Sequence, residues 1–178
     1  EDDIIPNKFG WDIEWILSTI MYGHINFNPP WLGKFDSGNG QWNFPYKTSL
    51  LSGQCSGFLR KALLYVGYLD SRFGRYGHEH VEHTMRMIRA GYGGELKKIE
   101  SREYIFYSIN GNIEVLPCES SSNDDDIEKN GSIFNEIWNE SIYRSPWRND
   151  EEMKIFRSEM SIFKKNQNDF SSIKSCIE

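Results

Sequence analysis

Apolar side chains recur every three to four positions in several stretches of the chain. Residues 9–22 show this spacing and end before a glycine, which predicts an amphipathic helix. The same pattern predicts helices over about 60–66 and 78–90, each again followed by a glycine at the C-terminal end. Two later stretches, about 132–143 and 150–165, predict shorter amphipathic helices.

Other stretches lack helical spacing. Residues 103–109 and 112–117 are rich in β-branched and aromatic residues, and the Asn-Gly pair between them predicts a hairpin with a type I′ turn. Residues 26–54 are rich in Gly, Asn, Pro and Trp and predict a long loop that lines or covers a site. The acidic stretch 119–131 predicts a surface linker. We therefore expect an α/β (mixed α+β) fold.

Composition narrows the class of protein. The 178 residues fit one domain, and the formal charge of -6 argues against nucleic acid or an anionic membrane as the main partner. No apolar run approaches the roughly 20 residues of a transmembrane helix, and the first residues lack a signal-peptide core. Three distant cysteines support neither a disulfide framework nor a zinc module. We expect a cytoplasmic protein.

The first candidate for chemistry is the acidic run Glu1, Asp2 and Asp3, followed by two isoleucines. Carboxylates at this spacing can chelate a hard divalent cation such as Mn²⁺ or Mg²⁺, which then bridges to substrate phosphates. The alternative is a solvated acidic segment without a ligand.

The second candidate is the segment 78–83, which holds three histidines and two glutamates. It lacks the His-Glu-x-x-His spacing of a zinc protease helix. A carboxylate in the first turn of a helix, after Gly77, suits a general base, and Glu79 has this position. The alternative is an ion-paired helix start, because acids favour helix N-termini in any case.

The third candidate is the turn 52–57, in which two glycines flank Cys55 and Ser56. Glycines allow the backbone to approach a ligand closely, although a plain strand-to-helix turn has the same composition.

The order of these segments resembles that of family 2 glycosyltransferases with the GT-A fold. The acidic run resembles their D-x-D segment. Residues 57–73 (GFLRKALLYVGYLDSRF) and 76–92 (YGHEHVEHTMRMIRAGY) resemble their two following motif segments. The resemblance covers residues 1 to about 93, roughly half of the chain.

The resemblance implies transfer of a sugar from a nucleotide-sugar donor to a glycan, lipid-linked or protein acceptor, usually with inversion. Asp3 would ligate the cation, and Glu1, Asp2 and Gly57 would contact the donor. Glu79 would be the general base of a direct displacement.

Two departures qualify these roles. The family's Glu-Asp pair is Glu79-His80 here, so we expect Glu79 to be the base, with Glu82 in reserve, and His80 to hold the acceptor together with Trp42. The resemblance also implies upstream nucleotide-binding units, so we expect a cut domain with low donor affinity and exposed sheet edges prone to self-association. The expected organisation is the carboxy-terminal half of a GT-A domain (1–118), a linker (119–131) and a helical appendage (132–178).

Two other functions remain open. A non-catalytic glycan- or protein-binding module would use the aromatic loop 31–46 as a stacking surface and would need no cation. A metal-dependent hydrolase would use the histidines and glutamates of segment 78–83, although their spacing counts against it.

Overall fold

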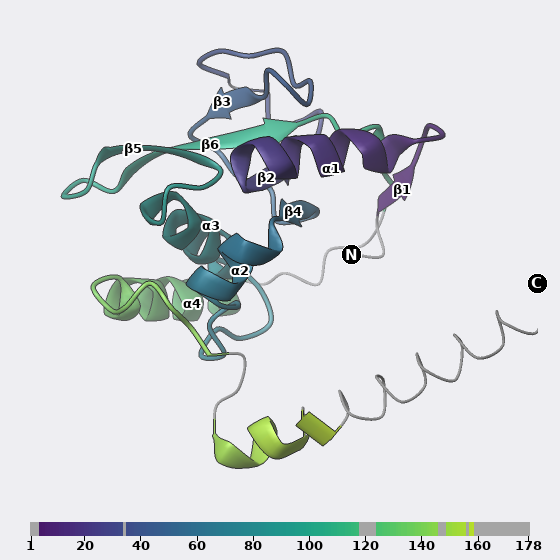
Figure 1. Ribbon diagram of the computed structural model, residues 1–178. Helices are drawn as coiled ribbons and strands as arrows, with labels where there is room; N and C mark the ends of the chain where they lie inside the picture. The colour runs from purple at the N-terminus through teal and green to yellow at the C-terminus, as the bar shows by residue number, and fades with distance from the viewer. Residues whose placement is uncertain (1–3, 34, 118–123, 146–148, 156, 159–178) are drawn as a thin grey trace, which may run out of the picture. The chain divides into compact units, whose positions relative to one another are not determined.

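The computed structural model describes residues 4–33, 35–117, 124–145, 149–155 and 157–158. The chain divides into two compact units, Glu1–Arg144 and Ser145–Glu178. The first unit is a mixed α/β structure (Figure 1). Its elements in chain order are β1 (Ile4–Pro6), α1 (Trp11–Tyr22), β2 (His24–Phe27), β3 (Tyr46–Thr48), β4 (Ser56–Phe58), α2 (Arg60–Val66), α3 (Glu79–Arg89), β5 (Gly94–Lys98), β6 (Glu103–Ile109), β7 (Ile113–Val115) and α4 (Asp124–Ile137).

A five-stranded mixed sheet forms the centre of this unit. Its order is β3-β6-β2-β4, and β5 pairs with β6 outside that path. Strands β2 and β6 are parallel, and the other pairs are antiparallel. Strands β1 and β7 form a separate two-stranded antiparallel ribbon.

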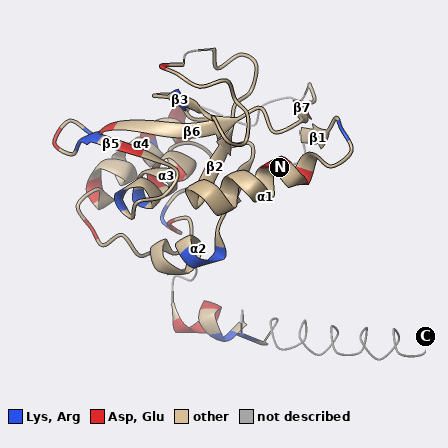
Figure 2. Ribbon diagram, turned by 45° about the horizontal axis from the view of Figure 1, so that its top comes forward, with Lys and Arg blue, Asp and Glu red and all other residues tan. Residues whose placement is uncertain are grey.

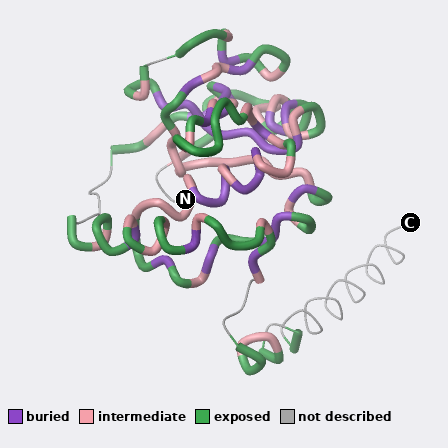
Figure 3. Tube along the Cα trace, turned by 90° about the vertical axis from the view of Figure 1, so that its left-hand side faces the viewer, coloured by how far each residue is buried: buried purple, intermediate pink, exposed green. Residues whose placement is uncertain are grey.

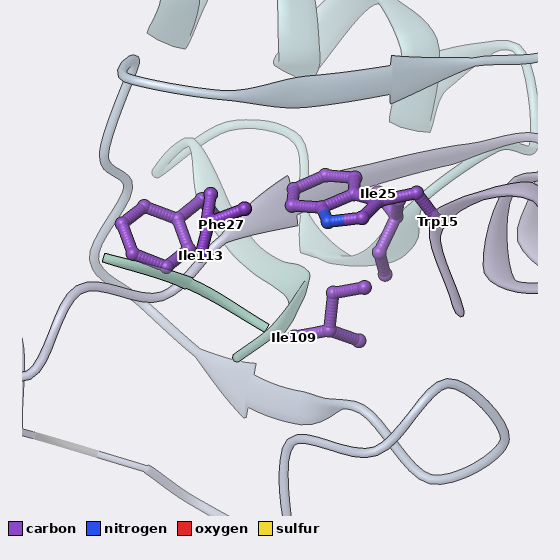
Figure 4. Close-up of a cluster of buried hydrophobic side chains, with 5 residues drawn as sticks. All are labelled: Trp15, Ile25, Phe27, Ile109 and Ile113. Carbon is purple, nitrogen blue, oxygen red and sulfur yellow. The ribbon is translucent and has the colours of Figure 1, made fainter. Parts of the chain in front are cut away.

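Helices α1 and α3 cover opposite faces of the sheet. Ile25 and Phe27 of β2 join Trp15 of α1 in one buried cluster (Figure 4). His24, whose side chain points to the opposite face because strand side chains alternate, hydrogen-bonds Thr84 of α3. Buried positions gather in the middle of the unit, and exposed ones lie mainly on its outer loops and helix surfaces (Figure 3).

The predicted hairpin is wrong, although both of its strands exist. β6 already pairs with β3 on one side and with β2 and β5 on the other, so it has no free edge for β7. The chain turns through Gly111 and Asn112, both with positive φ, and β7 then pairs with β1. The indole Nε1 of Trp15 donates to the Gly111 carbonyl at 2.9 Å and holds this turn against α1. The hairpin in this region is β5–β6.

Three expected helices are confirmed, as α1, α2 and α3. The residue after each helix (Gly23, Gly67 and Ala90) donates its backbone N–H to a carbonyl of the last turn. Within the expected loop 26–54, the chain forms the end of β2 and the short strand β3.

The expected linker 119–131 differs from the structure, because α4 begins at Asp124. Three aspartates in its first turn interact favourably with the helix dipole, so an acidic stretch here starts a helix. The first compact unit runs to Arg144 and includes α4, whereas we expected residues 132–178 to form an appendage.

In the second unit, residues 150–155 and 157–158 are helical, as expected for that part of 150–165. The Asn149 side chain caps this helix by accepting from the Glu152 amide at 3.0 Å. Among the helices that the structure describes, none has the length and apolar character needed to cross a membrane.

Candidate functional site

The first turn of α3 presents the candidate base. Gly77 and His78 both have positive φ, which stops any earlier helical turn, and the Glu82 amide donates to the His78 carbonyl at 2.8 Å. Glutamates in the first turn and arginines in the last complement the helix dipole. Glu79 is therefore the first helical residue, and it directly follows a sharp turn of the backbone.

The carboxylate of Glu79 is mostly buried and only partly engaged. Its side chain is 19 % exposed, and Oε1 lies 3.7 Å from Nε2 of His80. Oε2 is buried and, within the described part of the chain, has no hydrogen-bond partner. A buried acceptor without a donor is costly, which makes this oxygen available to a hydroxyl that enters the site.

His80 joins the start of α3 to the turn 52–57. A Cβ atom built on Gly53 would lie 2.4 Å from Cδ2 of His80, so the imidazole packs directly on the glycine backbone. The same turn is held locally by Ser52, whose hydroxyl accepts from the Gln54 amide. Two of the three candidate segments are thus neighbours in space.

Gly57 has a different neighbourhood. A Cβ atom there would lie 2.3 Å from Oγ1 of Thr19 and 3.1 Å from Cγ2 of Ile25, so a glycine is needed for α1 to approach β4. Its carbonyl accepts a hydrogen bond from Nδ1 of the buried His24. Close packing of α1 accounts for this glycine, and its contact with a donor stays a prediction.

Trp42 is not brought together with His80. Its carbonyl accepts from the hydroxyl of Ser18 on α1, at 3.1 Å. His80 instead belongs to α3, on the opposite face of the sheet. Of the two predicted acceptor residues, only His80 lies beside Glu79.

Glu1, Asp2 and Asp3 lie outside the described residues, so their donor and cation roles stay predictions. Among the residues that the structure does describe, no group of three His, Cys, Asp or Glu side chains could hold a metal ion.

The three histidines of segment 78–83 point to three different neighbours. His78 lies against Phe134 of α4, with ring centroids 5.7 Å apart, and His83 donates from Nε2 to the Gly67 carbonyl. His80 packs on Gly53. This dispersal leaves no shared imidazole site of the kind that the hydrolase alternative requires.

Glu82 is not a reserve base. Both of its carboxylate oxygens lie 2.8 Å from Nε of Arg86, and the two side chains are almost fully buried. Burial raises the pKa of Glu82, and the adjacent Arg86 opposes that rise. An oxygen pair occupied by a buried guanidinium is structural, so the geometry separates Glu79 from Glu82.

The arginine that completes this ion pair, Arg144, lies outside the motif segments and was not predicted from the sequence. Nη2 of Arg144 lies 3.6 Å from Oε1 of Glu82, and Nε of Arg144 lies 2.7 Å from Oδ2 of Asp70. The i, i+4 spacing of Glu82 and Arg86 was the available signal for the ion pair within α3. Glu140 and Arg144 have the same spacing but lie after the end of α4. Nothing in that spacing indicates that the two pairs meet.

Comparison of the chain with family models, with curated proteins and with solved structures found no match.

Proposed function

We propose that this chain is part of a GT-A glycosyltransferase. It transfers a sugar from a nucleotide-diphosphate-sugar to an acceptor hydroxyl, with inversion and with the help of Mn²⁺ or Mg²⁺. The observation that carries the proposal is Glu79: it occupies the base position of the motif and keeps a buried oxygen without a partner among the described residues. Glu82, the competing carboxylate, is engaged by Arg86.

The displacement follows from these positions. Glu79 accepts the proton of the acceptor hydroxyl, and the acceptor oxygen attacks the anomeric carbon. The bond from that carbon to the diphosphate breaks, and the diphosphate leaves with the electron pair. His80, beside Glu79, orients the acceptor.

The oxygen donors of Asp3, with Glu1 and Asp2 beside it, suit a hard divalent cation and the diphosphate it accompanies. When bound, the cation supplies positive charge that stabilises the leaving diphosphate. Asp3 would hold it, and Glu1 and Asp2 would contact the donor.

The test is calorimetric titration of the full-length protein with UDP- and GDP-sugars, with and without Mn²⁺. Asp3→Asn should abolish metal-dependent donor binding. Glu79→Gln should keep that binding and lower transfer by about 10²-fold to 10⁴-fold. Glu100→Gln, an exposed acid in the turn before β6, is the matched control and should change neither quantity. Failure of the unaltered protein to bind any of these donors with Mn²⁺ would overturn the proposal.

A second candidate is glycan binding by the aromatic loop. Trp31 and Phe44 are 63 % and 54 % exposed, and exposed aromatic rings can stack on sugar faces. In this case a glycan would bind without Mn²⁺, and Trp31→Ala would abolish binding while Glu79→Gln would not.

A further inference from the structure

A network of three acids and three arginines joins α3 to the segment after α2 and to the residues after α4. Its members are Asp70, Arg72, Glu82, Arg86, Glu140 and Arg144. The three negative and three positive charges balance. The four inner side chains, those of Asp70, Glu82, Arg86 and Arg144, are at most 8 % exposed. Buried charges persist only when they are paired, so each member depends on the others.

Arg144 reaches the network from outside the motif segments. Its amide donates to the Val66 carbonyl, and its carbonyl accepts from the Tyr68 amide, both at 3.1 Å. A Cβ atom on Gly67 would collide with the Arg144 carbonyl oxygen. The chain at Arg144 is therefore fixed to the turn after α2 by its backbone as well as by its side chain.

The same turn holds the middle of α3. Arg86 donates to the carbonyls of Val66 and Tyr68, at 2.8 and 2.6 Å, and His83 donates to that of Gly67 at 2.9 Å. Glu82 sits between the guanidinium groups of Arg86 and Arg144. Because Glu82 lies three residues after Glu79, the contacts that fix Glu82 also fix the rotation of the first turn.

We propose that Arg144 is a positioning residue for Glu79. By pairing with Asp70 and Glu82 together, it holds the first turn of α3 so that Glu79 keeps one carboxylate oxygen free for the acceptor. This inference rests on the proposed function for the role of Glu79, but the geometry it describes stands on the contacts alone. Under this proposal, a residue that follows α4 helps to position the general base.

The side chain must be arginine for this purpose. Nε lies 2.7 Å from Oδ2 of Asp70, as an ion pair without a hydrogen bond. Nη2 lies 3.6 Å from Oε1 of Glu82 and donates to the Ile137 carbonyl at 3.2 Å, and Nη1 donates to the Ser141 carbonyl. A lysine carries the charge but has one nitrogen, which cannot reach both acids in this fork arrangement.

The test is Arg144→Lys, with Arg102→Lys as the matched control. Arg102 also anchors the α4 region: its guanidinium lies over the Trp138 ring at 4.4 Å and donates to Asn135, and neither of these residues belongs to the network. In Arg144→Lys, amide hydrogen exchange should speed up several-fold over 79–83 and 66–70 and stay unchanged in α1. The kcat for transfer should fall by roughly tenfold or more, with the donor KM unchanged, because a displaced base affects the chemical step. Arg102→Lys should show neither effect.

Unchanged exchange over 79–83 in a folded Arg144→Lys protein would overturn the proposal. So would an equal rise across α1, which would indicate general loosening. If that variant does not fold, Glu140→Gln at the 42 % exposed rim of the network replaces it and should give the same local pattern in weaker form. If the unaltered protein shows no transfer at all, the proposed function fails while the exchange data still decide whether Arg144 holds the turn.

Discussion

Helices α1 and α3 lie on opposite faces of one sheet and depart from the usual helix pattern in opposite ways. α1 leaves large apolar side chains in solvent: Ile13, Ile16, Leu17, Ile20 and Met21. α3 buries polar and charged ones: Glu82, His83, Thr84 and Arg86. In Figure 2, α1 is mostly tan, whereas α3 carries red and blue segments.

The difference lies in how each helix is held. α1 is anchored by Trp15, which is packed among apolar residues and donates to Gly111, so its outer face contributes little. On α3, the buried polar groups have partners: Thr84 meets His24, and His83 meets the Gly67 carbonyl. Buried polar groups are tolerated when they are paired, and such a helix is sensitive to the loss of any one partner.

The largest effect should come from breaking the inner ion pair of α3. Glu82→Ala leaves Arg86 buried without its carboxylate, so we expect a loss of about 3–5 kcal/mol in the free energy of unfolding. Urea unfolding followed by circular dichroism measures it. The control is Glu103→Ala, which removes an exposed pair with Lys98 and should cost less than about 1 kcal/mol. Equal losses in the two variants would contradict the view that α3 depends on buried pairing.

Periodicity was sufficient for α1, α2 and α3, because each combines helical spacing with a break at its C-terminal end. The strand β2 was missed, although His24 and Asn26 alternate with Ile25 and Phe27 as strand residues do. A run of four residues is too short to stand out from the loop-like sequence that follows it. All four are buried, and the polar side chains of His24 and Asn26 are hydrogen-bonded to Gly57 and Ser56 of β4. Pairing between distant strands, such as β1 with β7, has no local signal either.

The candidate site could be predicted only in part, because contacts between distant segments have no local signal in the sequence. The motif spacing predicts a functional carboxylate at the start of α3, and it offers both Glu79 and Glu82. The choice between them depends on Arg86 and Arg144, and on the turn at Gly67 that holds both arginines. Contacts of this kind arise only from the tertiary fold.

A smaller effect should appear on acidification. Burial lowers the pKa of His24 to about 4 and that of His83 to about 3, so both are neutral in the folded protein while the unfolded chain takes up protons near pH 6.5. Stability is therefore complete above pH 6.5 and declines as the pH falls toward the folded pKa values. Between pH 8 and 4.5 each histidine should account for about 2 to 3 kcal/mol.

His83→Gln tests the contribution of His83 to the pH dependence of stability, because glutamine can still donate to the Gly67 carbonyl but does not titrate. Urea unfolding at several pH values should show a decline about half as steep as in the unaltered protein. A decline of undiminished steepness would mean that His83 takes up its proton without unfolding, and the buried polar face of α3 would then be less rigid than its contacts indicate.

The smallest effect should come from the outer face of α1. Ile20 is 64 % exposed, so Ile20→Gln removes little apolar contact and should change the free energy of unfolding by less than about 0.5 kcal/mol. Ile25→Val, at a fully buried position under the same helix, should cost about 1 kcal/mol although it removes only one methylene group. If Ile20→Gln proved the more costly of the two, the outer face of α1 would be covered in solution. The apolar outer face of α1 would then pack against another surface, and α1 would no longer differ from α3 in leaving apolar side chains in solvent.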